Sequence, residues 1–487
     1  MVRPVLLLSL LAASAAAQTP VRSCESLASL ALPDTVIESA ALQPAAAGRP
    51  EFCRVAAVLS HPPAADRIHV WVALPTSGWN GRFQGVGGGG FSGGSPNAIA
   101  GPVAQGYAAG ATDTGHEGGS GSFALDATGH LDWLLIRDNA YLGIHEMTVT
   151  GKALVAAFYG APPRHSYFNG CSTGGRQGLS EAQRYPADYD GILSGAPAIN
   201  WTKLHPEQMW GNLVMQELKD FVPQCKFAAA TAAAVAACDA ADGVRDGVLE
   251  NPRACTWDPK SLVGTSTPCG DFTAADAEVV RRIWQGPRRR DGSFLWYGLQ
   301  RGGDFMGLSS PGRPNPITME WWRYFLNQNP QWDWKVLTPA LYEHYWDQSV
   351  EEFSAVLATD NPDLAAFRDR GGKLVLWHGW SDQLIYPEGT IDYYQRVEKQ
   401  MGGPEATARF ARLFLAPGVG HCGGGTGPAP AGQFDAVVRW VEQGQAPDTL
   451  TARRGDRTRP LCQFPKVAKY KGSGSTDDAA SFTCVAP

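Results

Sequence analysis

A serine set between glycines, where a strand pattern gives way to a helix pattern, is the feature that most restricts the fold of this chain. The segment reads Gly170-Cys171-Ser172-Thr173-Gly174-Gly175 and fits the pattern G-x-S-x-G. Residues 166–169 before it favour a strand, and a helix pattern runs from 175 to 184. Such a serine lies on a strained turn, and glycines beside it let the strand and helix backbones approach. The segment therefore predicts a nucleophile at a helix N-terminus, where the helix dipole favours negative charge.

Short apolar runs on both sides of this motif alternate with helix patterns. The expected strands are 68–74, 82–86, 107–112, 166–170, 373–377 and 412–415. Residues 141–159 carry apolar side chains at helical spacing. Alternation of strands and helices predicts a mostly parallel sheet, and with the serine motif it indicates an α/β-hydrolase core in the α/β class.

The middle of the chain departs from this alternation. Residues 200–369 are rich in Trp, Pro, Gly and Asp, with an alanine-rich helix pattern at 228–237 and an aromatic cluster at 321–325. A structureless loop of this length is uncommon in a compact domain. We therefore expect a large inserted lid domain at 200–369, and a discontinuous catalytic core made of 18–199 and 370–487.

The N-terminus has the features of a secretory signal at 1–17. Arg3 supplies a positive charge, an apolar run covers 5–13, and small residues end at Ala17. The apolar run is too short to span a bilayer, and no later segment has eighteen uninterrupted apolar residues. We expect a secreted protein, extracellular or periplasmic, with no membrane partner.

Composition and cysteine content agree with export. Apolar residues make up 44% of the chain and charged residues only 18%, and the formal net charge is −6. This balance favours a large core and gives no reason to expect nucleic acid as a partner. Ten cysteines without a CxxC pair favour disulfides over a thiolate metal site.

A serine hydroxyl needs a base, and the base needs an orienting acid. In the chain order Ser…Asp…His, His421 is the last histidine and follows a strand pattern in a glycine-rich loop. Asp382 lies just beyond the strand at 373–377. We expect Ser172, Asp382 and His421 to form a catalytic triad. The weaker alternatives are His378 as the base, and Asp190 or Asp392 as the acid.

Two backbone N–H groups must stabilise the negative charge on the substrate oxygen. One is expected from Thr173, directly after the nucleophile. The other is expected from Gly88 or Gly89 in the run Gly87–Gly90, which follows the strand at 82–86.

Cysteines lie directly beside two of these residues. Cys171 precedes the nucleophile and Cys422 follows the base, so we expect a disulfide that holds the two segments together. The remaining pairs, expected mainly from proximity in the sequence, are Cys24–Cys53, Cys238–Cys255 and Cys462–Cys484, which leaves Cys225 with Cys269.

The Cys-Ser…Asp…His-Cys constellation resembles the tannase/feruloyl esterase family, which includes hydrolases of aromatic polyester monomers. The resemblance extends over nearly the whole mature chain, through the GGGG loop, GCSTGG, an Asp-rich loop, Trp-Trp-Arg-Tyr-Phe, GWSD and GHC. It implies an α/β-hydrolase core with an inserted lid, a serine esterase mechanism and structural calcium in the lid. No organic cofactor is expected.

The Asp-rich loop at 239–248 is the expected calcium site. Its carboxylates are Asp239, Asp242 and Asp246, and the backbone carbonyls of Val244 and Val248 would complete an oxygen cage. The resemblance implies the same spacing. The alternative is a solvated loop of Asx-turns without metal.

The resemblance implies a secreted serine carboxylic ester hydrolase acting on small esters of aromatic, phenolic acids, of feruloyl, galloyl or terephthalate type. Trp321 and Trp322 are candidates to stack on the acyl group, and Arg323 to meet a substrate carboxylate. Two other interpretations stay open: a serine peptidase or acyltransferase on the same scaffold, and a non-catalytic calcium-dependent binding module. The chain is expected to be a monomer or homodimer.

Overall fold

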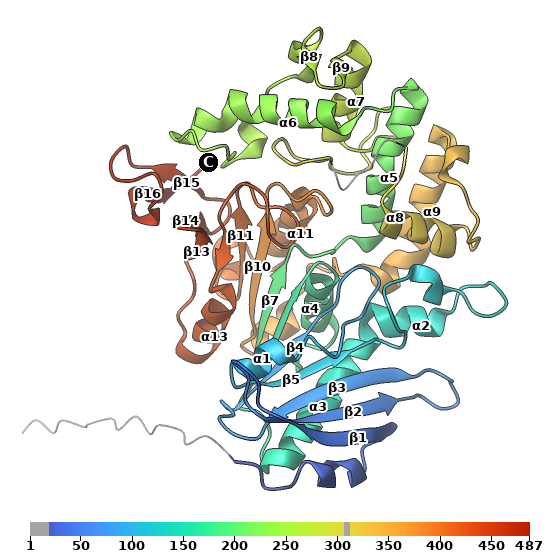
Figure 1. The fold of residues 1–487 in the computed structure, drawn as a ribbon, viewed down its shortest axis with the longest axis vertical. Helices are drawn as coiled ribbons and strands as arrows, with labels where there is room; N and C mark the ends of the chain where they lie inside the picture. Colours follow the sequence, from blue (N-terminus) through green and yellow to red (C-terminus); the bar gives the residue numbers. More distant parts are fainter. Residues whose placement is uncertain (1–18, 306–311) are drawn as a thin grey trace, which may run out of the picture.

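A nine-stranded sheet runs through the molecule in a computed structural model that describes residues 19–305 and 312–487 (Figure 1). The predicted signal segment, 1–17, lies outside the described residues. The strand order is β1-β2-β3-β5-β4-β6-β7-β10-β11. The strands are β1 (Thr35–Gln43), β2 (Phe52–Leu59), β3 (Ile68–Pro75), β4 (Arg82–Val86), β5 (Ala108–Thr112), β6 (His165–Cys171), β7 (Gly191–Gly195), β10 (Lys373–Gly379) and β11 (Ala411–Ala416).

The sheet is parallel where the sequence predicts strands joined by helices. Strands β5, β4, β6, β7, β10 and β11 pair in parallel, whereas β1, β2 and β3 form an antiparallel edge. The predicted α/β class is confirmed. Strands β1 and β2 are not among the strands expected from the sequence. β1 reads Thr-Val-Ile-Glu-Ser-Ala-Ala-Leu-Gln and has no fully buried residue, so its hydrophobic alternation is weak.

Alternate residues of the central strands enter two separate hydrophobic cores. In β10, Leu374 and Leu376 pack into one core, while Val375 and Trp377 pack into the other. Both sets are buried, as expected for parallel strands covered on both faces. The first core includes residues of α3 (Gly143–Tyr159), α4 (Thr173–Arg184) and α11 (Pro387–Gln400), and the second includes residues of α13 (Gln433–Gln443).

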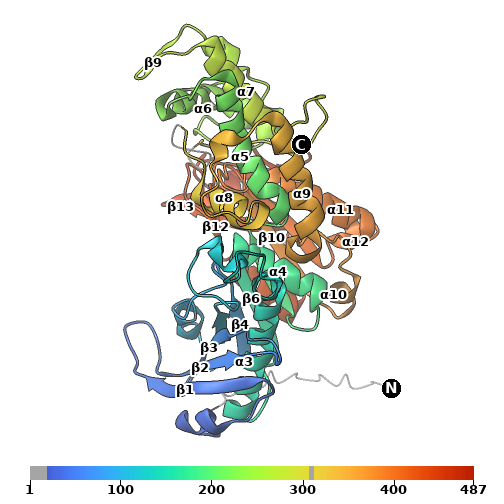
Figure 2. The ribbon, with the colours of Figure 1, turned by 90° about the vertical axis from the view of Figure 1, so that its right-hand side faces the viewer.

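Between β7 and β10 the chain leaves the sheet and builds a helical region. Its helices α5, α6 and α7 lie toward the end of the molecule that is far from β1 (Figures 1 and 2). The helices and strands are α5 (Trp201–Leu218), α6 (Gln224–Cys238), β8 (Ser266–Thr267), β9 (Gly270–Asp271), α7 (Ala274–Gln285), α8 (Pro316–Glu320), α9 (Pro339–Leu357) and α10 (Ala365–Asp369). A third hydrophobic core, rich in tryptophan, fills this region and includes Phe91 and Ile136 from the first part of the chain.

The C-terminal segment forms small sheets of its own. Strands β12 (Ala429–Ala431), β13 (Thr449–Arg454) and β14 (Arg457–Cys462) make one, and β15 (Val467–Tyr470) pairs with β16 (Phe482–Val485). The backbone N–H of Ala468 in β15 donates to Glu250 Oε1 at 2.7 Å. This contact ties the tail to the helical region, beside α6 (Figure 1).

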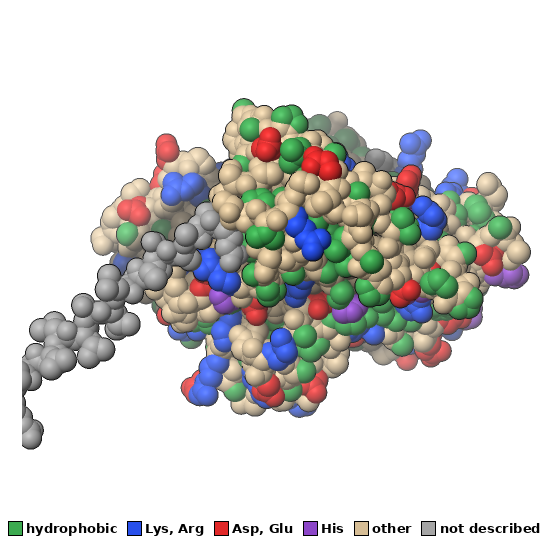
Figure 3. Space-filling view, turned by 90° about the horizontal axis from the view of Figure 1, so that it is seen from below, with side chains coloured by type: hydrophobic (Ala, Val, Ile, Leu, Met, Phe, Trp, Pro, Cys, Tyr) green, Lys and Arg blue, Asp and Glu red, His purple; other side chains and the backbone are tan. Residues whose placement is uncertain are grey.

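Figure 3 shows one face on which acidic, basic and apolar side chains are interspersed. Within 19–305 and 312–487, no helix combines the length and apolar character needed to cross a membrane.

Candidate active site

Ser172 occupies a sharp turn between β6 and α4. Its backbone has φ 64° and ψ −124°, a conformation that a residue with a side chain rarely adopts. The turn needs glycine neighbours, because a Cβ on Gly170 would lie 2.4 Å from the backbone carbon of Gly174, and one on Gly87 would lie 2.4 Å from the Cα of Gly174. The predicted strand, turn and helix are thus present, and steric contact explains the glycines.

Ser172 and His421 line the same cavity, which has a volume of about 390 Å³. Its wall is mainly apolar and comes from the glycine loop, the serine turn, α5, α8 and the two loops that follow β10 and β11. The lining residues are Gly88, Gly89, Gly90, Cys171, Ser172, Thr173, Ala198, Trp201, Leu204, His205, Gln208, Asn315, Ile317, Leu384, Ile385, His421 and Cys422.

Asp382 holds the imidazole of His421 through a hydrogen bond of 2.9 Å between Asp382 Oδ2 and His421 Nδ1. Asp382 is fully buried, and its Oδ1 accepts the backbone N–H groups of Leu384 and Ile385 at 2.9 and 2.8 Å. A carboxylate can only accept, so Nδ1 carries the proton and Nε2 of His421 is left as an acceptor. This is the tautomer that a general base needs.

Neighbouring residues keep the carboxyl group of Asp382 ionised. Burial alone would raise the pKa of this carboxyl, but hydrogen bonds from His378 and His421 outweigh burial and hold the pKa below its ordinary value of 3.8. Asp382 therefore stays ionised in its dry site.

His378, the alternative base, is fully buried and its ring nitrogens are occupied. Nε2 lies 3.0 Å from Asp382 Oδ2 and 2.8 Å from the carbonyl oxygen of Ile385, so this nitrogen carries the proton. Nδ1 lies 2.9 Å from Thr390 Oγ1 and accepts from that hydroxyl. His378 thus supports Asp382.

The alternative acids lie elsewhere. Asp190 accepts the backbone N–H of Ser166 at 2.8 Å. Asp392 pairs with Arg396 at 3.0 Å and accepts from Tyr297. Among the described residues, neither makes a hydrogen bond or ion pair with the imidazole of His421, whereas Asp382 does.

A disulfide joins the residues next to Ser172 and His421. Cys171 and Cys422 are bonded with their Cα atoms 5.9 Å apart, across 251 residues of sequence. The backbone N–H of His421 also donates to Gln383 Oε1 at 3.2 Å. These bonds fix the loop of His421 against the serine turn and the loop of Asp382.

All five expected disulfides are formed in the structure. They are Cys24–Cys53, Cys171–Cys422, Cys225–Cys269, Cys238–Cys255 and Cys462–Cys484. Disulfides in this number are typical of proteins from oxidising compartments.

The glycine loop packs directly on the serine turn. The N–H of Gly174 donates to the carbonyl oxygen of Gly88 at 3.0 Å, and Thr173 Oγ1 donates to the carbonyl oxygen of Gly90 at 2.6 Å. The N–H of Gly88, however, donates to Gln177 Oε1 at 3.0 Å. Of the two expected donors to the substrate, Gly88 therefore has its N–H engaged within the protein, and Gly89 stays a prediction.

The aromatic residues expected to touch substrate lie behind the cavity wall. Trp321 and Trp322 are fully buried in the core of the helical region, and Arg323 donates from Nε to the carbonyl oxygen of Trp332 at 3.2 Å. None of the three is among the described residues that line the cavity. They lie instead on a π-helical turn, Trp321–Leu326, packed against α9.

The cavity wall instead includes three residues of α5, which are Trp201, Leu204 and His205. Their contribution to the wall was not predicted from the sequence, although α5 follows α4 and β7 closely in the chain. Their position depends on how the helical region packs, which no local motif encodes.

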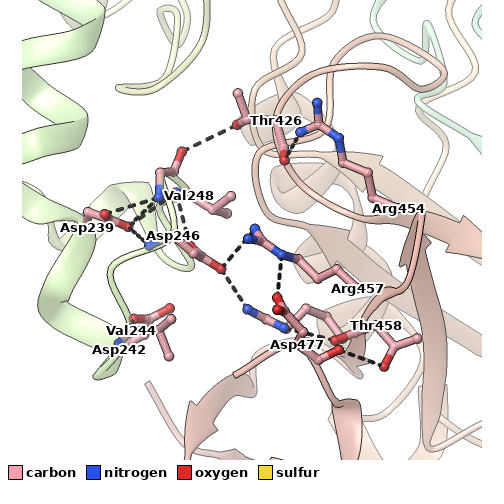
Figure 4. Close-up of polar contacts among 12 residues, drawn as sticks. Asp239, Asp242, Val244, Asp246, Val248, Thr426, Arg454, Arg457, Thr458 and Asp477 are labelled. Atoms are coloured by element: carbon pink, nitrogen blue, oxygen red, sulfur yellow. Dashed lines mark hydrogen bonds and ion pairs between the residues drawn. The ribbon is translucent and has the colours of Figure 1, made fainter. Parts of the chain in front are cut away.

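Figure 4 shows the acidic side chains of the Asp-rich loop together with the groups that they contact. Asp239 Oδ1 accepts the N–H groups of Asp246, Gly247 and Val248 at 3.2 Å each. Asp246 Oδ2 pairs with Arg459 of β14 at 2.7 Å. Burial, with Asp246 and Asp239 nearby, raises the pKa of Asp242 to about 6.

These residues fit calcium in donor chemistry, because calcium prefers oxygen ligands. Three carboxylates share one loop, and each carboxylate has lone pairs beyond those used by N–H donors. The pair of Asp246 with Arg459 means that this carboxylate would serve a cation and an arginine together.

A second acidic cluster is formed by residues of α3, α4 and the segment before β7. His145, Glu181 and Asp188 have ligand atoms within 4.8 Å of one another, and His145 Nδ1 lies 2.7 Å from Asp188 Oδ2. Burial, and then the charge of Asp188, raise the pKa of Glu181 well above its ordinary value. Both carboxylate oxygens of Glu181 are buried without a hydrogen-bond partner among the described residues.

Known proteins with the same organisation identify the family. A family model described as "Tannase and feruloyl esterase" matches residues 53–485. A probable feruloyl esterase of Arthroderma benhamiae is 40% identical over 461 residues, which cover 89% of this chain and 86% of the relative. The mono(2-hydroxyethyl) terephthalate hydrolase of Piscinibacter sakaiensis is 32% identical, covering 93% of this chain and 89% of that protein.

Solved structures agree with the sequence matches. The crystal structure of feruloyl esterase B from Aspergillus oryzae superposes with a TM-score of 0.84 and 29% identity, covering 95% of this chain and 99% of that one. Tannin acyl hydrolase from Aspergillus niger gives a TM-score of 0.85 and 26% identity, over 94% and 93% of the two chains. The chain therefore belongs to the tannase and feruloyl esterase family, and it is a carboxylic ester hydrolase.

Proposed function

We propose that this enzyme hydrolyses small esters of aromatic acids through an acyl-enzyme on Ser172, with His421 as general base and Asp382 as its orienting acid. The observation that carries the proposal is the hydrogen bond of 2.9 Å between Asp382 and His421 Nδ1 beside a cavity that Ser172 also lines. The bond between Cys171 and Cys422 supports it, because it ties the nucleophile's turn to the loop of the base.

The reaction has two halves. Ser172 Oγ attacks the ester carbonyl carbon while His421 Nε2 takes the hydroxyl proton, and the C–O bond to the alcohol breaks as the imidazolium returns that proton to the leaving oxygen. Water then attacks the acyl-enzyme, again with His421 as base, and releases the acid and Ser172. The N–H groups of Thr173 and Gly89 are the proposed donors to the carbonyl oxygen as it becomes negative.

The aromatic acyl group is the proposed occupant of the apolar part of the cavity. Trp201, Leu204 and Ile317 line it, and an indole ring offers both apolar area and a face for stacking. The names of two relatives, a probable feruloyl esterase and a terephthalate monoester hydrolase, point in the same direction.

The segment 200–369 is proposed to act as a lid domain over the core segments 18–199 and 370–487, since α5 and α8 contribute to the cavity wall. Calcium is proposed in the loop of Asp239, Asp242 and Asp246, with the carbonyls of Val244 and Val248. There it would brace the loop, and none of the reaction steps involves it. Export to an oxidising compartment is proposed from the five disulfides.

A side-by-side measurement of turnover tests this function. The substrates are methyl ferulate, methyl gallate, monomethyl terephthalate, 4-nitrophenyl acetate and a peptide amide. We expect at least one aromatic ester to be turned over far faster than the amide. Faster cleavage of the peptide, or transfer of the acyl group to an added alcohol in place of water, would refute the hydrolase assignment.

A further inference from the structure

A second cavity, with a volume of about 550 Å³, lies in the helical region and is lined by five arginines. It is larger than the cavity of Ser172, and Trp210 and Glu217 from the second half of α5 form part of its wall. The arginines come from α7 and from the loop after it, and they are Arg281, Arg282, Arg288, Arg289 and Arg290. Because the formal net charge of the whole chain is −6, this concentration of positive charge is local.

The two arginines of α7 are paired with acids within the protein. Arg281 donates to both carboxylate oxygens of Glu278, at 2.7 and 2.8 Å. Arg282 donates from Nη2 to Glu217 Oε2 at 2.9 Å. The charges of both guanidinium groups are therefore balanced by direct contacts.

Two of the three arginines on the loop are paired in the same way. Arg289 donates from Nη1 to Asp347 Oδ2 at 3.0 Å. Arg290 donates from Nε to Glu343 Oε2 at 3.3 Å. Both acids belong to α9, so these two pairs also hold the loop against that helix.

Arg288 is the exception, because it has no acidic partner. Its Nε is buried without a hydrogen-bond partner, and its other nitrogens make no hydrogen bond or ion pair within 19–305 and 312–487. The remaining segments, 1–18 and 306–311, contain no Asp or Glu that could supply a partner. Buried and half-buried charges are normally paired. Arg288, which is half-buried and lines the cavity, therefore presents an uncompensated guanidinium to it.

The loop holds the side chain of Arg288 in one place. The backbones of Arg288 and Phe294 pair as an antiparallel bridge, and the N–H of Arg289 donates to the carbonyl oxygen of Ser293 at 2.9 Å. Across this bridge the guanidinium carbon of Arg288 lies 5.0 Å from the centroid of the Phe294 ring, which is a cation–π contact. A guanidinium that is already oriented loses less conformational entropy when it binds a ligand.

The charges around the cavity set the charge of the ligand. Since four of the five arginines have an acidic partner, one positive charge is left, on Arg288. Asp291 in the same loop is exposed and does not line the cavity, so water screens its charge. A carboxylate balances one positive charge, whereas a divalent phosphate would bring a surplus negative charge into the cavity. The Nη1 and Nη2 groups of an arginine can donate two parallel hydrogen bonds to a carboxylate.

We propose that the cavity around Arg288 is a binding site for a ligand that bears a single carboxylate, separate from the catalytic cavity. Two sources supply this chemistry: the aromatic acid that ester hydrolysis releases, and a sugar acid. The site goes beyond the proposed function, because its evidence does not involve Ser172, Asp382 or His421. The first half of α5 lines the catalytic cavity and the second half lines this one, so one helix connects the two.

Isothermal titration calorimetry of the whole enzyme tests the site, with benzoate, glucuronate and inorganic phosphate as probes. We expect benzoate or glucuronate to bind, and the tighter of the two identifies the source. Arg288→Gln removes the charge and should weaken this binding by about tenfold or more, as expected for the loss of a charge-assisted hydrogen bond. The matched control is Arg370→Gln, at an exposed position directly after α10, which should leave the affinity unchanged.

A variant at Glu217 tests the charge count in the opposite direction. Glu217→Gln removes the acidic partner of Arg282, so the cavity gains a second uncompensated positive charge. The affinity for phosphate should then rise by a larger factor than the affinity for benzoate, because a divalent anion gains more from the added charge. An unchanged ratio of the two affinities would contradict the charge count.

Three results would overturn the inference. They are the absence of binding by either carboxylate, an affinity that Arg288→Gln leaves unchanged, and phosphate binding to the unmodified enzyme more tightly than both carboxylates. If Arg288→Gln does not fold, as judged by circular dichroism, neutral analogues decide: benzoate and glucuronate that bind no more tightly than benzamide and glucose would refute the role of the charge. Because the readout is binding and not turnover, any of these failures leaves the proposed ester hydrolysis untouched.

Discussion

At the scale of single residues, the site depends on side chains held in positions that they would not adopt alone. Ser172 has a positive φ of 64°, and Asp382 is a buried carboxylate that stays ionised because two histidines donate to it. Strain and buried charge are tolerated where the surroundings fix them. The geometry of Ser172 follows from its neighbouring glycines, and the charge of Asp382 from His378 and His421.

Removing the charge of the orienting acid should expose this dependence. In Asp382→Asn the amide can donate to the imidazole, so His421 is held in the wrong tautomer, and kcat should fall by about four orders of magnitude. Measured kcat values on the best aromatic ester check this. The control is Asp392→Asn, the alternative acid, which pairs with Arg396 and should leave kcat within about twofold of the unmodified enzyme, as surface changes usually do. An equal loss in both variants would count against Asp382.

The pH dependence has a defined sign. Since the pKa of Asp382 lies below 3.8, this group remains ionised as the solution becomes weakly acidic. Loss of the charge on Asp382 is therefore not expected to limit activity in weakly acidic solution.

At the scale of elements, the sequence predicts what short-range chemistry dictates and misses what packing dictates. The serine turn was predictable because glycines and a serine meet at a strand–helix junction, and β10 because it is a continuous apolar run. The wall formed by α5 was not predictable, because Trp201 and His205 reach the cavity only when the helical region packs on the core. Trp321 and Trp322 are tryptophans too, but they lie in the core of that region. Aromatic content alone therefore led to the wrong prediction that they contact substrate.

The Asp-rich loop gives an element-scale prediction. If calcium braces the loop, chelation with EGTA should lower the melting temperature and added calcium should restore it, with about 2.7 kcal/mol of stabilisation at a free calcium concentration of 100 times Kd. Turnover well below the transition should be nearly unchanged. Asp242→Asn should lose the response to EGTA, whereas Asp291→Asn, at an exposed loop position, should keep it. A melting temperature indifferent to EGTA and calcium would show that the loop is held by Arg459 and backbone N–H groups alone.

At the scale of the whole molecule, the account depends on segments far apart in sequence meeting at one cavity. The bond between Cys171 and Cys422 closes 251 residues, for which the chain-entropy model gives roughly 5 kcal/mol of stabilisation. Its position beside both the proposed nucleophile and the proposed base made this convergence predictable without knowledge of the intervening fold. The edge strand β1 has no fully buried residue, and its weak hydrophobic alternation hid it in the sequence.

Covalent labelling tests the central claim most directly. A fluorophosphonate reacts with a serine only where a base and an oxyanion site activate it, so digestion and mass spectrometry of the treated enzyme should find one adduct, on the peptide that contains Ser172. The adduct should be absent from Ser172→Ala and form far more slowly in His421→Ala. An unlabelled enzyme that still hydrolyses aromatic esters, or an adduct on another serine, would contradict the assignment.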